Sequence, residues 1–173
     1  MNKVTWVTKY DKGYIDYLTR LFEMRKNRND NERDEFDINL DKRKSSERLK
    51  IERLIKEKLN SVDELILKYK DGNRYIYIEV DARIGNNIFE VKCVSNTENI
   101  DNTLKNTKKR VVKQYKRLKQ LLGKNFNYYV IIVCDKYSTS EIFFPIDVTC
   151  NNLENVYNYV RYSDVDNLNI VLY

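Results

Sequence analysis

The sequence contains no histidine among its 173 residues. This absence excludes Ser-His-Asp triads, Cys-His dyads and zinc sites with histidine ligands. Any hydrolytic chemistry must therefore use carboxylates, lysine or tyrosine, together with a hard cation. Mg²⁺ fits such a site best, because it binds oxygen ligands and needs only one or two carboxylates.

Proline, glycine, cysteine and long apolar runs are also scarce. The three cysteines, Cys93, Cys134 and Cys150, have no metal-ligand spacing, so we expect reduced thiols in a cytosolic protein. The longest apolar runs, such as 128–134, are far shorter than the roughly 20 residues that span a bilayer. The first residues carry no apolar signal core. We therefore expect a cytoplasmic protein without a membrane partner, in the host cytoplasm if the protein is viral.

The net charge of +6 is unevenly distributed. Residues 101–124 hold nine basic side chains and one acid, whereas residues 135–173 hold six acids and two bases. This asymmetry favours a polyanionic partner for one surface. A solvated basic helix face is the alternative interpretation. The lysine- and asparagine-rich composition fits a microbial or viral source.

The length predicts a single domain of residues 1–173 with three parts. An N-terminal extension, 1–44, precedes a core, 45–135, and a C-terminal addition, 136–173, follows it. The extension is predicted to hold a strand at Val4–Thr8 and a helix at Gly13–Met24, with packing residues at helical spacing. Those residues are Tyr14, Tyr17, Leu18, Leu21 and Phe22. The addition is predicted to hold a strand at Glu141–Val148, a helix at Leu153–Val160 and a strand at Leu168–Leu172.

The core predicts a mixed α/β (α+β) fold with the order helix, three-stranded antiparallel meander, helix and strand. The first helix is expected over Ser46–Leu59, with Ser45 or Ser46 as its cap. The second is expected over Ile100–Leu122 and ends at Gly123. The strand-like runs are 65–69, 74–84, 88–95 and 128–134, and Asp71-Gly72 and Gly85-Asn86 are hairpin signals between the first three.

Two neighbouring strands of the meander carry the candidate catalytic residues. If Gly85-Asn86 is the hairpin loop, Ile84 lies opposite Asn87 and Asp81 lies opposite Glu90. Opposed residues have Cβ atoms about 5 Å apart on the same face. Two carboxylates this close repel each other, and a divalent cation between them converts the repulsion into binding.

Lys92 points to the same face as Glu90, since the two residues are two apart on one strand. Its amine can orient or deprotonate an attacking water and stabilise charge on a phosphate. The Val91 carbonyl is a candidate further metal ligand. The alternative interpretation is an exposed cross-strand charge cluster without a metal.

A third carboxylate belongs to the first core helix. Glu47 lies about 40° from Ile51 on a helical wheel, inside the apolar stripe of that helix. A carboxylate on an apolar face is costly unless something pairs with it. Glu47 therefore indicates either a capping interaction or a site.

At these residues the sequence resembles the PD-(D/E)XK nuclease superfamily, which includes restriction endonucleases and Holliday-junction resolvases. Asp81 followed by Glu90-Val91-Lys92 matches the acidic residue and the E-x-K element, although Val80 replaces the proline of the motif. The resemblance covers about 90 residues. It implies a restriction-endonuclease-like core with a mixed central sheet flanked by helices, Mg²⁺ or Mn²⁺ as cofactor, and Glu47 completing the catalytic site. Some members also carry a glutamine at the position that Gln114 matches.

The function that follows is phosphodiester hydrolysis, with DNA a more favoured substrate than RNA. The basic helix would contact phosphates, which carry no sequence information. Many members of the superfamily are dimers, so a homodimer is a further partner that the resemblance implies. The alternatives are a non-catalytic nucleic-acid-binding module and a viral or mobile-element protein-interaction factor. The predicted substrate contacts are Lys108, Lys109, Lys113, Gln114, Lys116 and Arg117.

Overall fold

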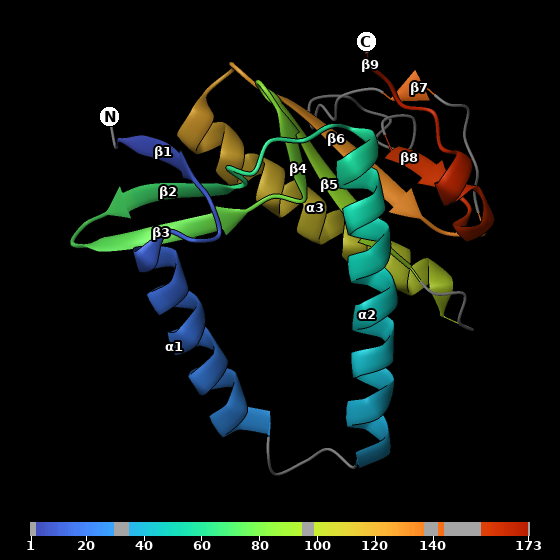
Figure 1. Cartoon of the computed structure of the whole chain (residues 1–173), viewed down its shortest axis with the longest axis horizontal. Helices are drawn as coiled ribbons and strands as arrows, with labels where there is room; N and C mark the ends of the chain where they lie inside the picture. Colours follow the sequence, from blue (N-terminus) through green and yellow to red (C-terminus); the bar gives the residue numbers. More distant parts are fainter. Residues whose placement is uncertain (1–2, 30–34, 95–98, 137–141, 144–156, 173) are drawn as a thin grey trace. The chain divides into compact units, whose positions relative to one another are not determined.

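The structure is a computed structural model that describes residues 3–29, 35–94, 99–136, 142–143 and 157–172. It is a mixed α/β fold, with antiparallel and mixed sheets flanked by helices (Figure 1). The chain divides into two compact units, Met1–Arg53 with Asp63–Glu79 and Leu54–Val62 with Val80–Tyr173. The single domain of residues 1–173 stays a prediction.

The first unit contains a three-stranded antiparallel sheet in the order β1-β2-β3. Its strands are β1 (Val4–Val7), β2 (Ile66–Asp71) and β3 (Arg74–Glu79), and it also holds helix α1 (Lys12–Asn29). The hairpin between β2 and β3 turns at Gly72, whose φ of 58° suits glycine. The predicted Asp-Gly turn and the strands predicted at Val4–Thr8 and 65–69 are thus confirmed.

Helix α1 is fixed to this sheet by its amino end. The Tyr14 amide donates to Asp11 Oδ1 at 2.9 Å, so Asp11 caps the helix. Asp11 also pairs with Lys68 Nζ of β2 at 3.1 Å. The Tyr14 hydroxyl donates to Glu79 Oε2 at 2.8 Å. Tyr14 and Tyr77 are buried together with Ile66 in the core of the unit.

The predicted packing face of α1 is only partly correct. Tyr14 is buried, and Tyr17 and Leu21 are half-buried. Leu18 and Phe22 are 43% and 70% exposed, so their predicted burial is wrong. Within this unit the helix meets the sheet at its first turns and then extends away from it (Figure 1). Helical spacing shows which residues share a face, but it does not show how far that face is covered.

The helix before the core begins much earlier than predicted. Helix α2 spans Glu35–Lys58, so Ser45 and Ser46 lie inside it and cannot cap its start. The polar stretch before residue 46 is thus helical from Glu35 onward. Helical apolar periodicity fails to find this half, because its apolar residues Phe36, Ile38 and Leu40 alternate with polar ones. Its glutamate, lysine and arginine residues still favour helix by intrinsic propensity.

The second unit is built on a four-stranded mixed sheet in the order β4-β5-β6-β8. Strand β5 pairs antiparallel with β4 and parallel with β6, and β6 pairs parallel with β8. The predicted mixed sheet is therefore present. The strands are β4 (Ala82–Ile84), β5 (Asn87–Cys93), β6 (Asn127–Val133) and β8 (Tyr157–Val160).

The predicted three-stranded meander is not one sheet. The single strand predicted over 74–84 is interrupted at Val80 and Asp81, so that β3 pairs with β2 in one sheet and β4 pairs with β5 in another. The interruption coincides with an aspartate, a residue that strands disfavour. Asp81 therefore lies where the ladder is interrupted.

Helix α3 (Ile100–Leu122) covers one face of this sheet and has the predicted boundaries. Gly123 follows it with φ 69°, and its N–H donates to the Lys119 carbonyl, as the predicted end requires. The Tyr115 ring contacts the Tyr128 ring of β6, with centroids 5.7 Å apart. The buried residues of the helix are Leu104, Val111, Tyr115 and Leu118.

The C-terminal part differs from the prediction. Residues 157–160 were predicted to end a helix, but they form β8, and all four are buried. The predicted strand 141–148 is seen as β7 (Ile142–Phe143), and its other residues lie outside the described ones, as do 153–156 and Cys150. A 3-10 helix, η2 (Tyr162–Asn167), precedes β9 (Val171–Leu172), which pairs with β7. In the part of the chain that is described, no helix has the length and apolar character needed to cross a membrane.

Candidate active site

The hairpin between β4 and β5 brings the predicted acidic residues together. Ile84 pairs with Asn87, Arg83 with Ile88 and Ala82 with Phe89, which is the predicted register. One further step places Asp81 opposite Glu90. Gly85 in the turn has φ 56°, which accounts for the glycine in this two-residue loop.

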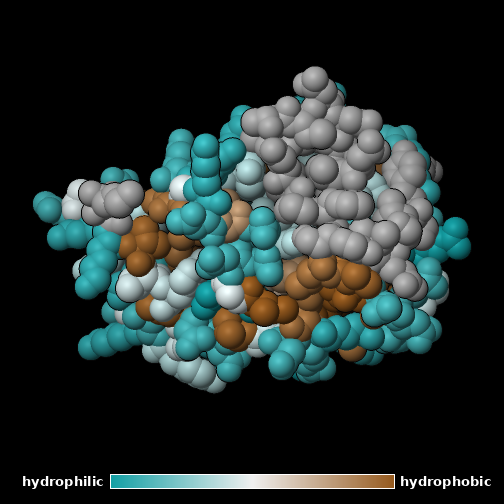
Figure 2. Space-filling view, turned by 90° about the horizontal axis from the view of Figure 1, so that it is seen from above, coloured by the Kyte–Doolittle hydropathy of each residue, from teal (hydrophilic) through white to brown (hydrophobic). Residues whose placement is uncertain are grey.

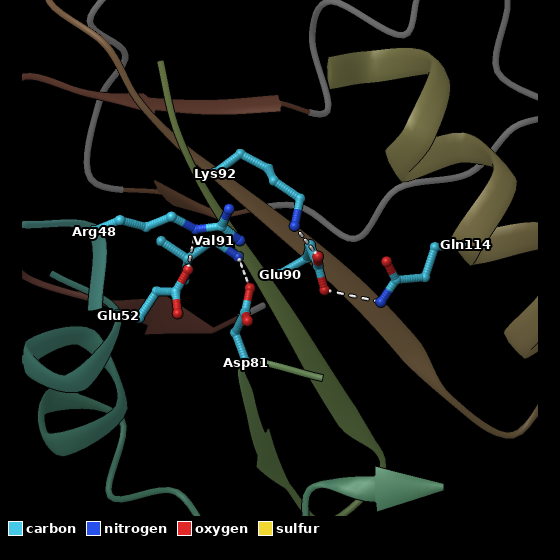
Figure 3. Close-up of polar contacts among 7 residues, drawn as sticks. All are labelled: Arg48, Glu52, Asp81, Glu90, Val91, Lys92 and Gln114. Atoms are coloured by element: carbon cyan, nitrogen blue, oxygen red, sulfur yellow. Dashed lines mark hydrogen bonds and ion pairs between the residues drawn. The ribbon is translucent and has the colours of Figure 1, made fainter. Parts of the chain in front are cut away.

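Asp81 is held by the neighbouring strand through its side chain. Its Oδ2 accepts the Val91 N–H at 2.7 Å (Figure 3). In a continuing antiparallel ladder, Val80 would form the next hydrogen-bonded pair with Val91. The carboxylate takes the Val91 amide instead. Because the N–H and C=O of one strand residue face the same neighbouring strand, the Val91 carbonyl also faces this edge.

Glu90 is buried, with only 3% of its surface exposed. Its Oε1 contacts Lys92 Nζ, and its Oε2 accepts the Gln114 side-chain amide at 3.0 Å. Figure 3 shows these two groups meeting the carboxylate from β5 and from α3. A buried carboxylate requires such partners. Glu90, Lys92 and Gln114 therefore form one polar cluster, and Asp81 is tied to it through the Val91 amide.

Tyr128 is a further residue beside this cluster, and its sequence pattern does not predict that position. Tyr128 lies on β6 opposite Ile88, is fully buried, and its hydroxyl has no hydrogen-bond partner among the described residues. Burial raises the pKa of Tyr128 well above its usual value, and the charges of Glu90 and Asp81 raise that pKa further, as does the closeness of the Glu90 carboxylate to the hydroxyl. The buried Tyr128 hydroxyl therefore lies beside both carboxylates. An apolar strand gives no sequence signal for it.

We expect Tyr128→Phe to raise the free energy of unfolding by about 1 kcal/mol, because the buried hydroxyl is desolvated without compensation. Urea denaturation in EDTA measures the effect. The matched variant is Tyr14→Phe, which removes the hydroxyl that donates to Glu79 and should lower the same free energy. If Tyr128→Phe also destabilises the protein, its hydroxyl is already hydrogen-bonded in the folded chain.

The predicted substrate contacts on α3 separate into two groups. Lys108 is half-buried, with its Nζ 5.1 Å from the Tyr157 ring centroid and 5.4 Å from that of Tyr159. Gln114 contacts Glu90 and so belongs to the cluster. The remaining four are exposed to solvent, where phosphate contacts can form. These are Lys109, Lys113, Lys116 and Arg117.

Glu47 is not one of the residues that define this cluster. It is exposed on the part of α2 that belongs to the first unit, and its catalytic role stays a prediction. On the same helix, Arg48 Nε pairs with Glu52 Oε1 at 2.6 Å. The predicted burial of Glu47 in an apolar stripe is wrong, because α2 is exposed along residues 46–50.

The donor set at the cluster suits a hard cation. The carboxylates of Asp81 and Glu90 and the Val91 carbonyl offer oxygen ligands. Mg²⁺ is often held by one or two carboxylates, with water filling its other coordination positions. Among the described residues there is no group of three or more acidic or cysteine side chains placed to hold a metal. Any cation here would therefore rely on Asp81, Glu90, backbone oxygen and water.

Comparison of the chain with protein-family models, with curated proteins and with solved structures finds no match. The resemblance to PD-(D/E)XK nucleases stays a prediction, and the function must be argued from this cluster.

Proposed function

We propose that the chain is a metal-dependent nuclease that hydrolyses phosphodiester bonds, with DNA favoured over RNA. One observation carries the proposal: Asp81 at the Val91 amide lies opposite a buried Glu90 that contacts Lys92. Two carboxylates and an amine gathered on adjacent strands are more than a folded domain needs for stability. A buried charge cluster of this kind is typical of functional sites.

The cation would be held by Asp81 and Glu90, with the Val91 carbonyl as a further oxygen. Bound there, Mg²⁺ or Mn²⁺ supplies positive charge that polarises a phosphate and lowers the pKa of a coordinated water. The absence of histidine favours this arrangement, since the described cluster offers oxygen ligands and an amine only.

The protein residues have distinct roles in this proposal. Gln114 holds Oε2 of Glu90 and so fixes the direction of its carboxylate. Lys92 neutralises the same carboxylate at Oε1. A cation at that oxygen would compete with the ammonium and free it to stabilise negative charge on the phosphate or to orient the attacking water. The contact with Lys92 thus gives the buried carboxylate of Glu90 a charged partner.

Binding of the substrate backbone would fall to the basic residues of α3. Exposed lysine and arginine side chains follow its solvent face, and such side chains bind phosphates without reading sequence. The same observation supports the second candidate, a nucleic-acid-binding module without catalysis. The exposed basic residues are Lys105, Lys109, Arg110, Lys113, Lys116 and Arg117.

A cleavage assay separates the two candidates. We expect purified protein to cut DNA when Mg²⁺ or Mn²⁺ is present, to stop in EDTA, and to recover when excess Mn²⁺ is added. Plasmid, linear duplex, single-stranded DNA and RNA should be compared in parallel. Salt-sensitive binding without cleavage under either metal would contradict the nuclease and support the binding module.

A further inference from the structure

A hollow of about 900 Å³ lies within the first unit, between α1 and the hairpin of β2 and β3. Tyr17, Arg20 and Leu21 of the helix line one side, and Arg74, Tyr75 and Tyr77 of the hairpin line the other. Its volume is in the range of ligand-binding clefts. We call it the α1–hairpin groove, and none of its residues takes part in the cluster around Glu90.

The groove presents several aromatic rings. The Tyr17 and Tyr77 ring centroids are 5.2 Å apart, and Tyr75 is 56% exposed at the rim. Gly13 is required here, because a Cβ atom at that position would overlap the Tyr77 hydroxyl. Lys68 Nζ lies 4.9 Å from the Tyr75 ring centroid and secures one side of that ring. Exposed rings beside a hollow offer flat surfaces on which planar groups can stack.

The charged groups of the groove come from both walls. Arg20 and Arg74 line it together with Asp16 and Asp71, yet no ion pair joins them among the described residues. Arg20 Nε donates only to the Asp16 backbone carbonyl, at 3.3 Å. Both guanidinium groups thus retain their charge for a ligand, and a planar guanidinium suits a phosphate.

These features favour one occupant over others. The two carboxylates would repel a duplex, which presents phosphates along both edges of its grooves. A single strand also presents bases, whose amino groups can donate to carboxylates and whose faces stack on tyrosine. On the face drawn in Figure 2, hydrophobic side chains occur in patches bordered by hydrophilic ones. The α1–hairpin groove combines rings, guanidinium groups and hydrogen-bond acceptors.

We propose that the α1–hairpin groove binds an unpaired stretch of nucleic acid, with bases stacked on Tyr75 and Tyr17 and phosphates contacting Arg74 and Arg20. This inference rests on the proposed function, since it assumes a nucleic-acid substrate. It adds a preference for single-stranded segments that the charges of α3 alone would not give.

The test is fluorescence anisotropy of a labelled single-stranded oligonucleotide in EDTA, so that no cleavage occurs. Tyr75→Ala should weaken binding roughly ten-fold, because stacking contributes on the order of 1–3 kcal/mol per base. Arg74→Gln should weaken it as well. The matched controls are Tyr10→Ala, which removes a 76% exposed tyrosine outside the groove, and Lys70→Gln, which removes one charge from the same hairpin. Both should change affinity less than two-fold.

The inference would be overturned if the groove variants and their controls bound the oligonucleotide with equal affinity. It would also be overturned if an unlabelled duplex or an acidic peptide displaced the labelled oligonucleotide as well as an unlabelled single strand does. Thermal unfolding of each variant verifies that the fold is retained. If the protein cleaves DNA in a metal-dependent way but the groove variants bind the single strand normally, only the inference about the groove is refuted. If the groove variants bind the single strand more weakly but the unmodified protein cleaves nothing with any metal, only the proposed nuclease function is refuted.

Discussion

Asp81→Asn and Glu90→Gln are each expected to lower phosphodiester cleavage on the order of 1000-fold, because each removes a charge that a cation at this site needs. Glu90 is the more informative of the two, since it is 3% exposed and held by Lys92 and Gln114. The measurement is the single-turnover cleavage rate of linear DNA in Mn²⁺, with enzyme in excess.

The control for this series is Glu57→Gln, which neutralises an exposed carboxylate of the second unit outside the cluster. Its cleavage rate should equal that of the unmodified chain. A second readout is Mn²⁺ binding by calorimetry, which should be lost in both site variants without depending on turnover. Cleavage and metal binding that survive both substitutions would show that these carboxylates are not the site.

Lys92→Met is expected to lower the free energy of unfolding by roughly 2 to 3 kcal/mol in EDTA, since a buried carboxylate left without its cation is strongly destabilising. The cost is smaller than is usual for broken buried pairs, because Gln114 still donates to Glu90 and the Lys92 side chain is 20% exposed. Urea denaturation at neutral pH provides the value.

The double variant Glu90→Gln with Lys92→Met determines the cause of that loss. Removing the carboxylate as well should restore most of the stability, since a neutral side chain needs no cation beside it. Lys113→Met, at an exposed position of α3, should change stability by no more than about 0.5 kcal/mol. A double variant as unstable as the single one would show that Lys92 contributes through packing and not through the pair.

Both predictions depend on features of the hairpin that could be predicted from the sequence. Gly85-Asn86 sets the register, because a two-residue turn with positive φ fixes which residues face each other. Ile84 then lies opposite Asn87, and counting back places Asp81 opposite Glu90. The boundaries of α3 were equally accessible, since its apolar spacing and the following Gly123 are local signals.

Other features were not accessible in this way. The start of α2 lacks apolar periodicity, and residues 157–160 were interpreted as helix although they complete the sheet as β8. Residues 157–160 (Tyr-Asn-Tyr-Val) are too short a segment for local preference to decide between helix and strand. They form a strand here because β6 offers a partner strand beside which they are buried. Leu18 and Phe22 had helical spacing, but their exposure depends on where α1 leaves its sheet.

The sequence by itself determined the pairing of Asp81 with Glu90 and the position of Lys92, because turn chemistry and strand alternation act over a few residues. Only the tertiary structure decided that Gln114 holds Glu90, that Asp81 takes the Val91 amide from a regular ladder, and that the Tyr128 hydroxyl is buried beside both carboxylates. Those contacts join residues on different elements, and their distances depend on how α3 and β6 pack against β5, which no local pattern records.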